Sequence, residues 1–227
     1  MAPVLGYWNI RGLACPIRLL LEQAGAEYEE KLYGCGPPPS FDRAEWLKDK
    51  FELGLDFPNL PYYIDGDVKL TQSHVILRYL ARKHNMAGNN EAEMRRVDLA
   101  ANQVFDYHMD YVKVVYNPEY AKMKEEYLKN LPDKLKLLTK FLGQNKFVAG
   151  DHVTYADFVL FEFLECQHLL SPTVLNDFPA LQQFHQNVSK LPAVEKYFNS
   201  PKAIKYPFNG APAFIGGQYS EQLQKKD

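Results

Sequence analysis

The sequence predicts two domains, an α/β domain followed by an all-α helical domain. Strand-like and helix-like runs alternate over residues 1–84. Residues 85–90, which read Asn-Met-Ala-Gly-Asn-Asn, form the clearest linker of the chain. Beyond the linker, residues 91–227 contain long runs with helical spacing and no convincing strand. Prolines and glycines from Lys202 onward predict an irregular tail at the end of the helical domain.

Composition narrows the class of protein. Hydrophobic residues make up 46% of the 227 and charged residues 24%, which is typical of a globular protein with a sizeable core. The net charge of −2 gives no electrostatic basis for binding nucleic acid or an anionic membrane. No signal-peptide pattern and no bilayer-length apolar run is present. We therefore expect a cytoplasmic protein with no nucleic-acid partner and no membrane insertion.

Cysteines and histidines suggest neither a disulfide framework nor a metal site. Cys15, Cys35 and Cys166 are odd in number and widely spaced, as expected for reduced thiols. The six histidines fall in no ligand-spaced pair, so we expect no metal. Cys15 precedes Pro16 at a predicted helix start, where the helix N-terminus lowers a thiol pKa. A thiol-disulfide oxidoreductase using Cys15 therefore stays an alternative, although no second cysteine lies nearby.

The first domain begins with a strand, a helix and a second strand. Residues 4–8 read as a short buried strand and residues 28–33 as an alternating one. Between them, Pro16 suits the first turn of a helix and Gly25 its end. This length predicts a βαβ unit with parallel strands and a right-handed crossover.

A hairpin and a helix complete the first domain. The run at residues 34–40 is too rich in Gly and Pro for regular structure, and a short helix is expected at residues 43–50. Residues 62–64 and 68–70 read as strands joined by an Asp-Gly turn, and a helix follows as far as His84. The resulting order, β-α-β-α-β-β-α, is thioredoxin-like.

This hairpin offers main-chain groups to a ligand. Pro61 opens its first strand, where proline removes no ladder hydrogen bond and is able to be cis. The backbone at Asn59 and Leu60 is then expected to be unpaired, which suits a peptide ligand. A new helix is expected to begin at Gln72 and Ser73, and its N-terminus suits a carboxylate. Alternatively, Ser73 is only the N-cap of its helix.

The second domain is expected to be built around one apolar helix. Thr154 and Asp157 have capping-box spacing and open this helix, predicted at residues 158–164. Pro132 is expected to break or kink the helix that contains it. The other helices are predicted at residues 91–116, 121–142, 180–190 and 193–198.

Several motifs resemble the mu class of cytosolic glutathione S-transferases over roughly residues 1–210. They are Leu5-Gly6-Tyr7-Trp8 with Ile10-Arg11-Gly12, Phe41-Asp42-Arg43 with Trp46, Gly54-Leu55-Asp56-Phe57-Pro58-Asn59-Leu60-Pro61-Tyr62, Ala81-Arg82-Lys83-His84-Asn85, and Ala149-Gly150-Asp151. The resemblance implies the glutathione S-transferase architecture, a homodimer, and conjugation of glutathione to small hydrophobic electrophiles. Glutathione would be a co-substrate, with no cofactor. A non-catalytic carrier of apolar ligands stays an alternative.

Tyr7 is the catalytic residue that the resemblance implies. By itself, one tyrosine among 15 is more often a packing residue. A free thiol has a pKa of about 8.5 and a tyrosine of about 10, so tyrosine is a poor base for the thiol. A neutral Tyr7 hydroxyl that donates a hydrogen bond to the sulfur instead favours the thiolate.

Further binding residues come from the same resemblance. Arg43, Trp46 and Lys50 share one helix face by spacing, as an amphipathic surface helix also would. The resemblance implies that these three residues, together with Trp8, bind the glycine carboxylate of glutathione. Asp106 is expected to reach the γ-glutamyl amine of the neighbouring subunit. The implied glutathione-binding set is Tyr7, Trp8, Arg43, Trp46, Lys50, Asn59, Leu60, Gln72, Ser73 and Asp106.

Residues for the electrophile and the dimer are implied as well. Tyr116 resembles the family's second tyrosine, and His108, Met109 and Phe208 are expected to bind the electrophile with it. Phe57 lies between Asp56 and Pro58, where an apolar side chain would be exposed in a monomer. It is expected to fill a pocket of the partner subunit; the alternative is local packing under the hairpin.

Overall fold

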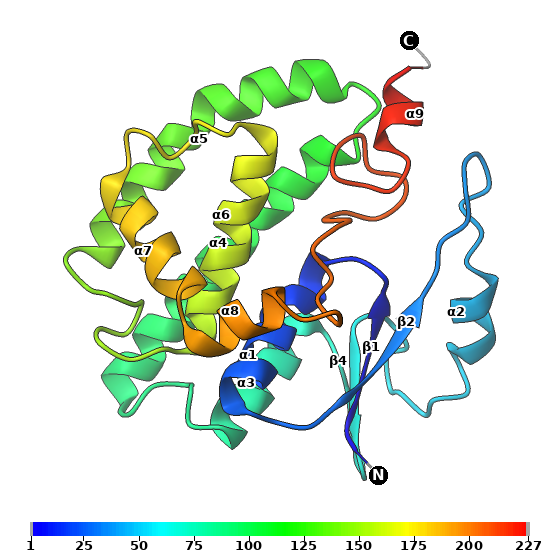
Figure 1. Ribbon diagram of the computed structural model, residues 1–227, viewed down its shortest axis with the longest axis horizontal. Helices are drawn as coiled ribbons and strands as arrows, with labels where there is room; N and C mark the ends of the chain where they lie inside the picture. Colours follow the sequence, from blue (N-terminus) through cyan, green and yellow to red (C-terminus); the bar gives the residue numbers. More distant parts are fainter. Residues whose placement is uncertain (1, 226–227) are drawn as a thin grey trace. The chain divides into compact units, whose positions relative to one another are not determined.

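The computed structural model describes residues 2–225, and these form two compact units (Figure 1). One unit joins Met1–His84 to Lys196–Asp227, and the other is Asn85–Glu195. The tail from residue 196 thus groups with the α/β unit, whereas the sequence placed it with the helical domain. The limits of the predicted domains, 1–84, 85–90 and 91–227, stay a prediction.

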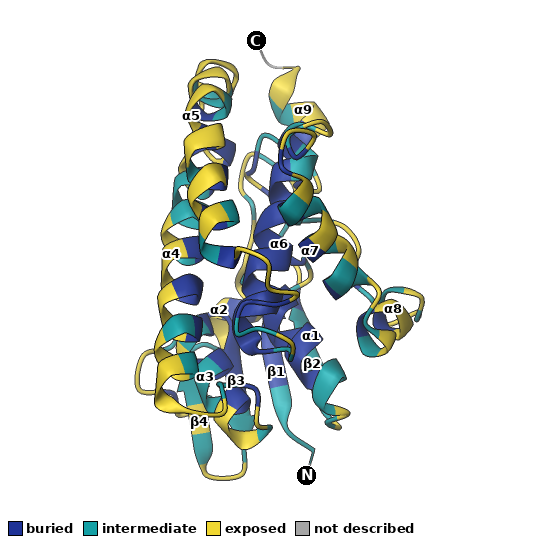
Figure 2. Cartoon of the chain, turned by 90° about the vertical axis from the view of Figure 1, so that its left-hand side faces the viewer, coloured by how far each residue is buried: buried dark blue, intermediate teal, exposed yellow. Residues whose placement is uncertain are grey.

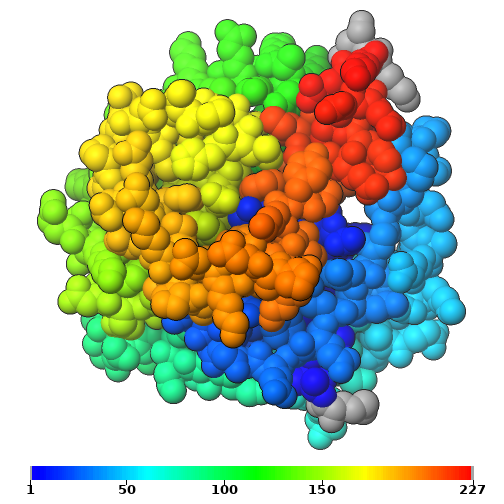
Figure 3. Space-filling model, in the orientation of Figure 1, coloured from blue at the N-terminus to red at the C-terminus, as the bar shows by residue number. Residues whose placement is uncertain are grey.

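The tail is tied to the start of the chain by main-chain hydrogen bonds. The Arg11 N–H donates to the Pro207 carbonyl (2.8 Å), and the Gly12 N–H donates to the Phe208 carbonyl (3.0 Å). In the space-filling view, orange tail atoms lie against blue atoms of the N-terminal segment (Figure 3). These long-range bonds explain why the tail groups with the α/β unit. The sequence did not predict them, because no local pattern marks such bonds.

A four-stranded mixed sheet forms the frame of the first unit. Its strands are β1 (Val4–Trp8), β2 (Glu29–Tyr33), β3 (Tyr62–Asp65) and β4 (Val68–Thr71), in the order β2-β1-β3-β4. Strand β2 pairs parallel with β1, whereas the β1–β3 and β3–β4 pairs are antiparallel. With the intervening helices, this confirms the predicted β-α-β-α-β-β-α order and the thioredoxin-like fold.

Helices cover both faces of this sheet. The α/β unit contains α1 (Cys15–Ala24), α2 (Ala44–Asp49), α3 (Ser73–Lys83) and a short 3-10 helix, η1 (Gly12–Ala14). Helices α1 and α3 pack together on one side, and α2 lies on the other (Figure 1). Successive strand residues serve the two layers: the Tyr62 ring stacks with Trp46 of α2, and the Tyr63 ring lies 6.2 Å from that of Tyr79 in α3.

One helix of the tail was not predicted. Helix α9 (Ser220–Gln224) follows a loop that the Ser220 hydroxyl organises, accepting from the Gly217 N–H and donating to the Ala213 carbonyl, both at 2.8 Å. The prediction of an irregular tail is therefore wrong at this end, because the Ser220 hydroxyl, together with the Tyr206 hydroxyl and the Asn209 amide, fixes the loop before the helix.

The second unit is helical, as predicted. It contains α4 (Glu91–Val115), α5 (Tyr120–Leu142), α6 (Tyr155–Leu170) and α7 (Pro179–Ser189), and α8 (Pro192–Phe198) spans its boundary. Pro132 lies inside α5, so the predicted break is wrong. Proline removes one intrahelical hydrogen bond. Leu131 and Leu135 are both fully buried, and their packing keeps the helix continuous.

Helix α6 is the core of the second unit. Most of its residues are buried, whereas α4 and α5 carry exposed outer faces (Figure 2). The predicted capping box is present, with Thr154 as N-cap and Asp157 as its partner. The Asp157 carboxylate accepts from the N–H groups of Val148 and Thr154, both at 2.7 Å. Burial raises the pKa of Asp157 to about 6, although these two bonds act in the opposite direction.

No helix within residues 2–225 combines the length and the apolar character that crossing a membrane demands.

Candidate functional site

Tyr7 lies on β1 with its hydroxyl held by the following loop. The side chain is 6% exposed, and its oxygen accepts a hydrogen bond from the Leu13 N–H of η1 at 3.1 Å. A hydroxyl that accepts one hydrogen bond becomes a stronger donor in another, because the two bonds polarise the O–H group cooperatively. The loop therefore favours Tyr7 as a donor to an anion.

Gly12 allows the loop to pass close to this hydroxyl. Its φ is +42°, and a Cβ there would lie 2.8 Å from the Tyr7 oxygen. Any larger residue would meet the phenol and would also adopt a left-handed backbone that glycine tolerates best. Gly12 thus sets the distance between the loop and the candidate catalytic group.

Phe208 is brought to the same loop, as a contributor to one site should be. Besides the bond from Gly12, the Phe208 ring lies 4.2 Å from the guanidinium carbon of Arg11. Arg11 is 4% exposed and also contacts the Phe198 ring at 5.2 Å. This cation–π contact orients Phe208 near the loop that follows Tyr7.

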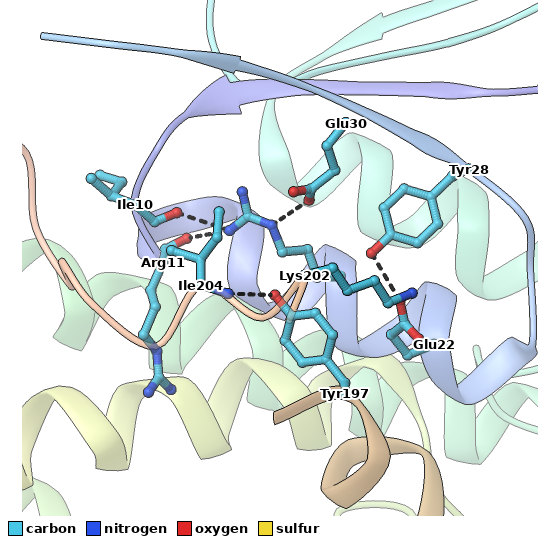
Figure 4. A network of polar contacts seen from close by, with 9 residues as sticks. Ile10, Arg11, Glu22, Tyr28, Glu30, Tyr197, Lys202 and Ile204 are labelled. Atoms are coloured by element: carbon cyan, nitrogen blue, oxygen red, sulfur yellow. Dashed lines mark hydrogen bonds and ion pairs between the residues drawn. The ribbon is translucent and has the colours of Figure 1, made fainter. Parts of the chain in front are cut away.

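Arg18 is a supporting residue that the sequence did not reveal. Its buried guanidinium donates to Glu30 at 2.5 Å and to the carbonyls of Ile10 at 2.9 Å and Arg11 at 3.2 Å (Figure 4). These bonds fix the main chain between Tyr7 and η1. The only signal in the sequence was a single arginine inside an apolar helical run, which is expensive to bury without partners.

The residues expected at the glycine carboxylate surround α2. Trp46 is 6% exposed; its ring stacks on that of Tyr62 at 6.3 Å and lies in a T-shaped arrangement with that of Tyr33 at 5.3 Å. Arg43 is exposed at the N-cap of α2, and Lys50 is half-buried at its C-cap. The aromatic packing holds one indole rigidly, with a cationic side chain at each end of its helix. Trp8, at the end of β1, is half-buried.

Asn59 and Leu60 precede β3, and their backbone differs from the expectation. The Leu60 N–H donates to the Asn59 side-chain oxygen at 2.9 Å, so this group is not unpaired. A short polar side chain can bond locally in this way wherever the backbone lacks a ladder partner. The Leu60–Pro61 peptide bond is cis, as the sequence allowed.

Gln72 and Ser73 lie at the junction between β4 and α3. Gln72, not Ser73, is the N-cap, and no side-chain capping bond is formed. The alternative in which Ser73 is only an N-cap is therefore wrong. Gln72 is exposed and has φ +68°, a conformation that costs a non-glycine residue energy. This leaves a helix start with its dipole directed at an incoming anion.

The four site residues from the second unit all belong to α4 or its end. Asp106 is exposed, and His108 and Met109 are half-buried. Tyr116 is the C-cap and is 37% exposed. Met109 and Tyr116 share a helix face two turns apart, whereas Asp106 and His108 point to nearly opposite sides. By the same spacing Met109 points between these two directions, so Asp106 and His108 are placed for different contacts.

Two further predictions concern exposure. Phe57 is 76% exposed in the single chain, so local packing under the hairpin is not its role. Cys15 begins α1 but is 1% exposed. Reactive cysteines are usually accessible, so this burial argues against thiol-disulfide chemistry there.

Comparisons with known proteins agree on one family. Residues 3–82 match the family model described as glutathione S-transferase, N-terminal domain. Residues 105–201 match the model described as glutathione S-transferase, C-terminal domain. Together the two matches cover most of the chain.

Individual relatives narrow the class. The chain is 48% identical to Glutathione S-transferase Mu 1 of Rattus norvegicus over 207 residues, which is 91% of this chain and 95% of the relative. It is 47% identical to the Mu 1 protein of Homo sapiens over the same shares. Among solved structures, the glutathione S-transferase Blo t 8 has a TM-score of 0.86 at 32% identity, covering 94% of this chain and 99% of that one. The Pi-class enzyme of Onchocerca volvulus has a TM-score of 0.84 at 34% identity, covering 94% and 100%.

Proposed function

The chain belongs to the mu class of glutathione S-transferases and is a glutathione transferase, and from this premise we propose that Tyr7 stabilises the thiolate of bound glutathione. Glutathione is then a co-substrate, no cofactor takes part, the second substrate is a small hydrophobic electrophile, and the protein acts in the cytoplasm. The observation that carries the role of Tyr7 is its hydroxyl, which accepts the Leu13 N–H, on a side chain that is 6% exposed. The relatives favour this activity over the carrier and the thiol-disulfide oxidoreductase.

The chemical step needs a thiolate at neutral pH. The glutathione thiol gives its proton to solvent, and the sulfur lone pair then attacks an electrophilic carbon, forming a carbon–sulfur bond. With an aryl halide the carbon–halogen bond breaks and halide leaves. With an epoxide or an enone, a carbon–oxygen bond or the carbon–carbon π bond breaks, and the resulting anion takes a proton from solvent. Lowering the thiol pKa by about two units requires roughly 2.7 kcal/mol. One charge-assisted hydrogen bond from the Tyr7 O–H, with a positive local field, is of this size. Tyr7 stays protonated throughout, because it acts as a donor and not as a base.

Glutathione binding is proposed to use the ends of two helices and the segment before β3. Arg43, Trp46 and Lys50 take the glycine carboxylate together with Trp8. The Leu60 N–H leaves the Asn59 side chain and, in the manner of an added antiparallel strand, pairs with the cysteinyl backbone.

The γ-glutamyl end is proposed to bind at the start of α3. Gln72 and Ser73 receive its carboxylate there, because an uncapped helix N-terminus attracts an anion. Asp106, exposed on α4, is proposed to reach the γ-glutamyl amine of a neighbouring subunit.

The electrophile is proposed to contact Tyr116, Met109, His108 and Phe208. Tyr116 combines an accessible phenol with a position at the end of α4, which suits polarising the electrophile. Phe208 offers an apolar surface held by Arg11. Apolar walls with a few polar groups are typical of small-molecule sites.

A homodimer is proposed with Phe57 as its anchor. A large aromatic side chain that is 76% exposed is costly in a monomer and typical of a central interface contact. Phe57 would insert into a pocket of the partner subunit.

Tyr7→Phe tests the catalytic proposal. It should lower kcat/KM for conjugation by about 100-fold or more, as removal of an oxyanion-type donor does. Glutathione affinity should change little, because the lost bond acts on the thiolate. Ultraviolet titration of the complex should show the thiol ionising near its solution pKa. Tyr79→Phe, the same change on α3, is the control and should keep activity. If the thiol pKa of bound glutathione is the same in Tyr7→Phe as in the parent protein, the proposed thiolate-stabilising role of Tyr7 is wrong.

Phe57→Ser tests the dimer. Sedimentation or light scattering at low concentration should show a shift from dimer to monomer. Phe51→Ser is a matched control, because Phe51 is similarly exposed (73%) but is not the proposed anchor. A dimer as tight in Phe57→Ser as in Phe51→Ser would contradict the proposed contact, without bearing on the role of Tyr7.

A further inference from the structure

Two helices of the second unit bring together three potential metal ligands. Glu165 and His168 lie on α6, and His185 lies on α7. One ligand atom from each lies within 4.8 Å of the other two. The His185 Nε2 is 2.7 Å from a Glu165 carboxylate oxygen, and the two imidazole rings are 5.3 Å apart at 89°. All three side chains are half-buried.

The helices set this cluster by their spacing and packing. Glu165 and His168 are three residues apart, so they share a face of α6. Helix α7 packs against α6 and carries His185 to that face (Figure 1). The ring of Phe161, one turn earlier on α6, stacks on His185 at 4.8 Å and 23°. This contact fixes the plane of the imidazole.

We propose that Glu165, His168 and His185 bind a divalent transition-metal ion, with Zn²⁺ as the best match. Two imidazole nitrogens and one carboxylate oxygen form a common zinc ligand set with one position left for water or another ligand. Zinc–ligand bonds of about 2.0–2.2 Å place tetrahedral ligand atoms roughly 3.4 Å apart. The observed separations, from 2.7 Å to at most 4.8 Å, bracket this value. Small side-chain rotations would therefore bring the three ligand atoms to the separations of a tetrahedral zinc site.

The protons and charges of the cluster are compatible with binding. The His185 Nε2–H donates to Glu165, and the metal takes the place of this hydrogen while the imidazole proton moves to Nδ1. One carboxylate partly balances the charge of the ion.

The sequence predicted no metal because its six histidines show no ligand spacing. His168 and His185 lie on different helices, so their separation along the chain carries no such signal. None of the three residues belongs to the proposed glutathione or electrophile set. The metal would link α6 to α7, and the inference stands apart from the proposed role of Tyr7.

Zinc titration of the full-length protein tests this inference. Isothermal titration calorimetry with ZnCl₂, in a Cys35→Ser background to remove a half-buried competing thiol, should show one site per chain. Co²⁺ should give the visible absorption of a tetrahedral site. Glu165→Gln keeps an acceptor for His185 but loses the anionic ligand. It should weaken binding by more than the about 10–100-fold that losing an outer-shell partner costs.

Further variants separate this site from other binding. His168→Gln and His185→Gln should also abolish the cobalt spectrum, and zinc should raise the Tm of the parent but not of these variants. His152→Gln is the matched control, because His152 pairs with Glu93 at 3.3 Å but joins no three-ligand cluster among residues 2–225. Absent saturable binding, or equal binding in the parent and Glu165→Gln, would overturn the proposal and leave only a hydrogen-bonded polar cluster.

Discussion

Helices α3 and α6 both begin beside a hydroxyl residue, yet their N-termini are built in opposite ways. At α6, Thr154 and Asp157 form a capping box in which the buried carboxylate accepts three hydrogen bonds, two from N–H groups and one from the Thr154 hydroxyl. At α3, the N-cap is Gln72, with φ +68° and no side-chain capping bond. Ser73 follows as the first residue of the helix. One start is closed by the chain itself, and the other is open to a ligand.

The difference separates residues that stabilise the fold from residues that bind. Each buried donor left without an acceptor costs about 1–3 kcal/mol, so closing the start of α6 contributes directly to folding. An open start contributes little to folding but keeps the helix dipole and first-turn N–H groups for an anion. Changes at α6 should therefore affect stability, and changes at α3 should affect glutathione binding.

Asp157→Ala should have the largest effect. It removes the acceptor of three donors inside the core of the second unit, and we expect a loss of about 3 kcal/mol or more in the free energy of unfolding. Urea unfolding followed by circular dichroism measures it. Asp157→Asn should be less harmful, because the amide oxygen still accepts on one side. A loss below about 1 kcal/mol for Asp157→Ala would show that the capping box is not the main stabiliser of α6.

The pair Thr154→Ala and Ser73→Ala compares the two starts with the same kind of change. Thr154→Ala should lower stability by about 1–2 kcal/mol, as loss of an N-cap does, with little effect on KM. Ser73→Ala should leave stability within about 0.5 kcal/mol and raise KM for glutathione about tenfold, as loss of a hydrogen bond to a charged group does. Urea unfolding and steady-state kinetics give the four values. Equal stability losses in the two variants would remove the distinction between the starts.

The sequence predicted the closed start better than the open one. A capping box depends only on residue types three positions apart, so Thr154 and Asp157 could be recognised directly. The backbone conformation of Gln72 depends on the connection between β4 and α3. Glutamine as a residue type does not predict a positive φ. Pro132 shows the same limit, since burial of Leu131 and Leu135 outweighs a local rule that favours a break.

For the candidate site, residues inside motifs were predictable and their supports were not. Tyr7 and Ser73 followed from resemblance, and the structure adds the Leu13 N–H at the Tyr7 hydroxyl. The role of Arg18 depends on Glu30 and on the Ile10 carbonyl, which approach it only in the folded chain. Such long-range polar contacts leave no periodic signal in a sequence.

Gln72→Gly should have a smaller effect on stability than Asp157→Ala, and of the opposite sign. Glycine adopts φ +68° without strain, so relief of the roughly 1–3 kcal/mol held at Gln72 should exceed the entropy that glycine adds to the unfolded chain. We expect a gain of about 1 kcal/mol in the free energy of unfolding, together with a higher KM for glutathione because the proposed carboxylate ligand is lost. Gln72→Ala removes the same side chain but keeps the strain, so it should raise KM equally without the gain in stability.

If Gln72→Gly is no more stable than Gln72→Ala by urea unfolding, the backbone at the start of α3 is not strained. If both keep the parent KM, the side chain does not bind the carboxylate.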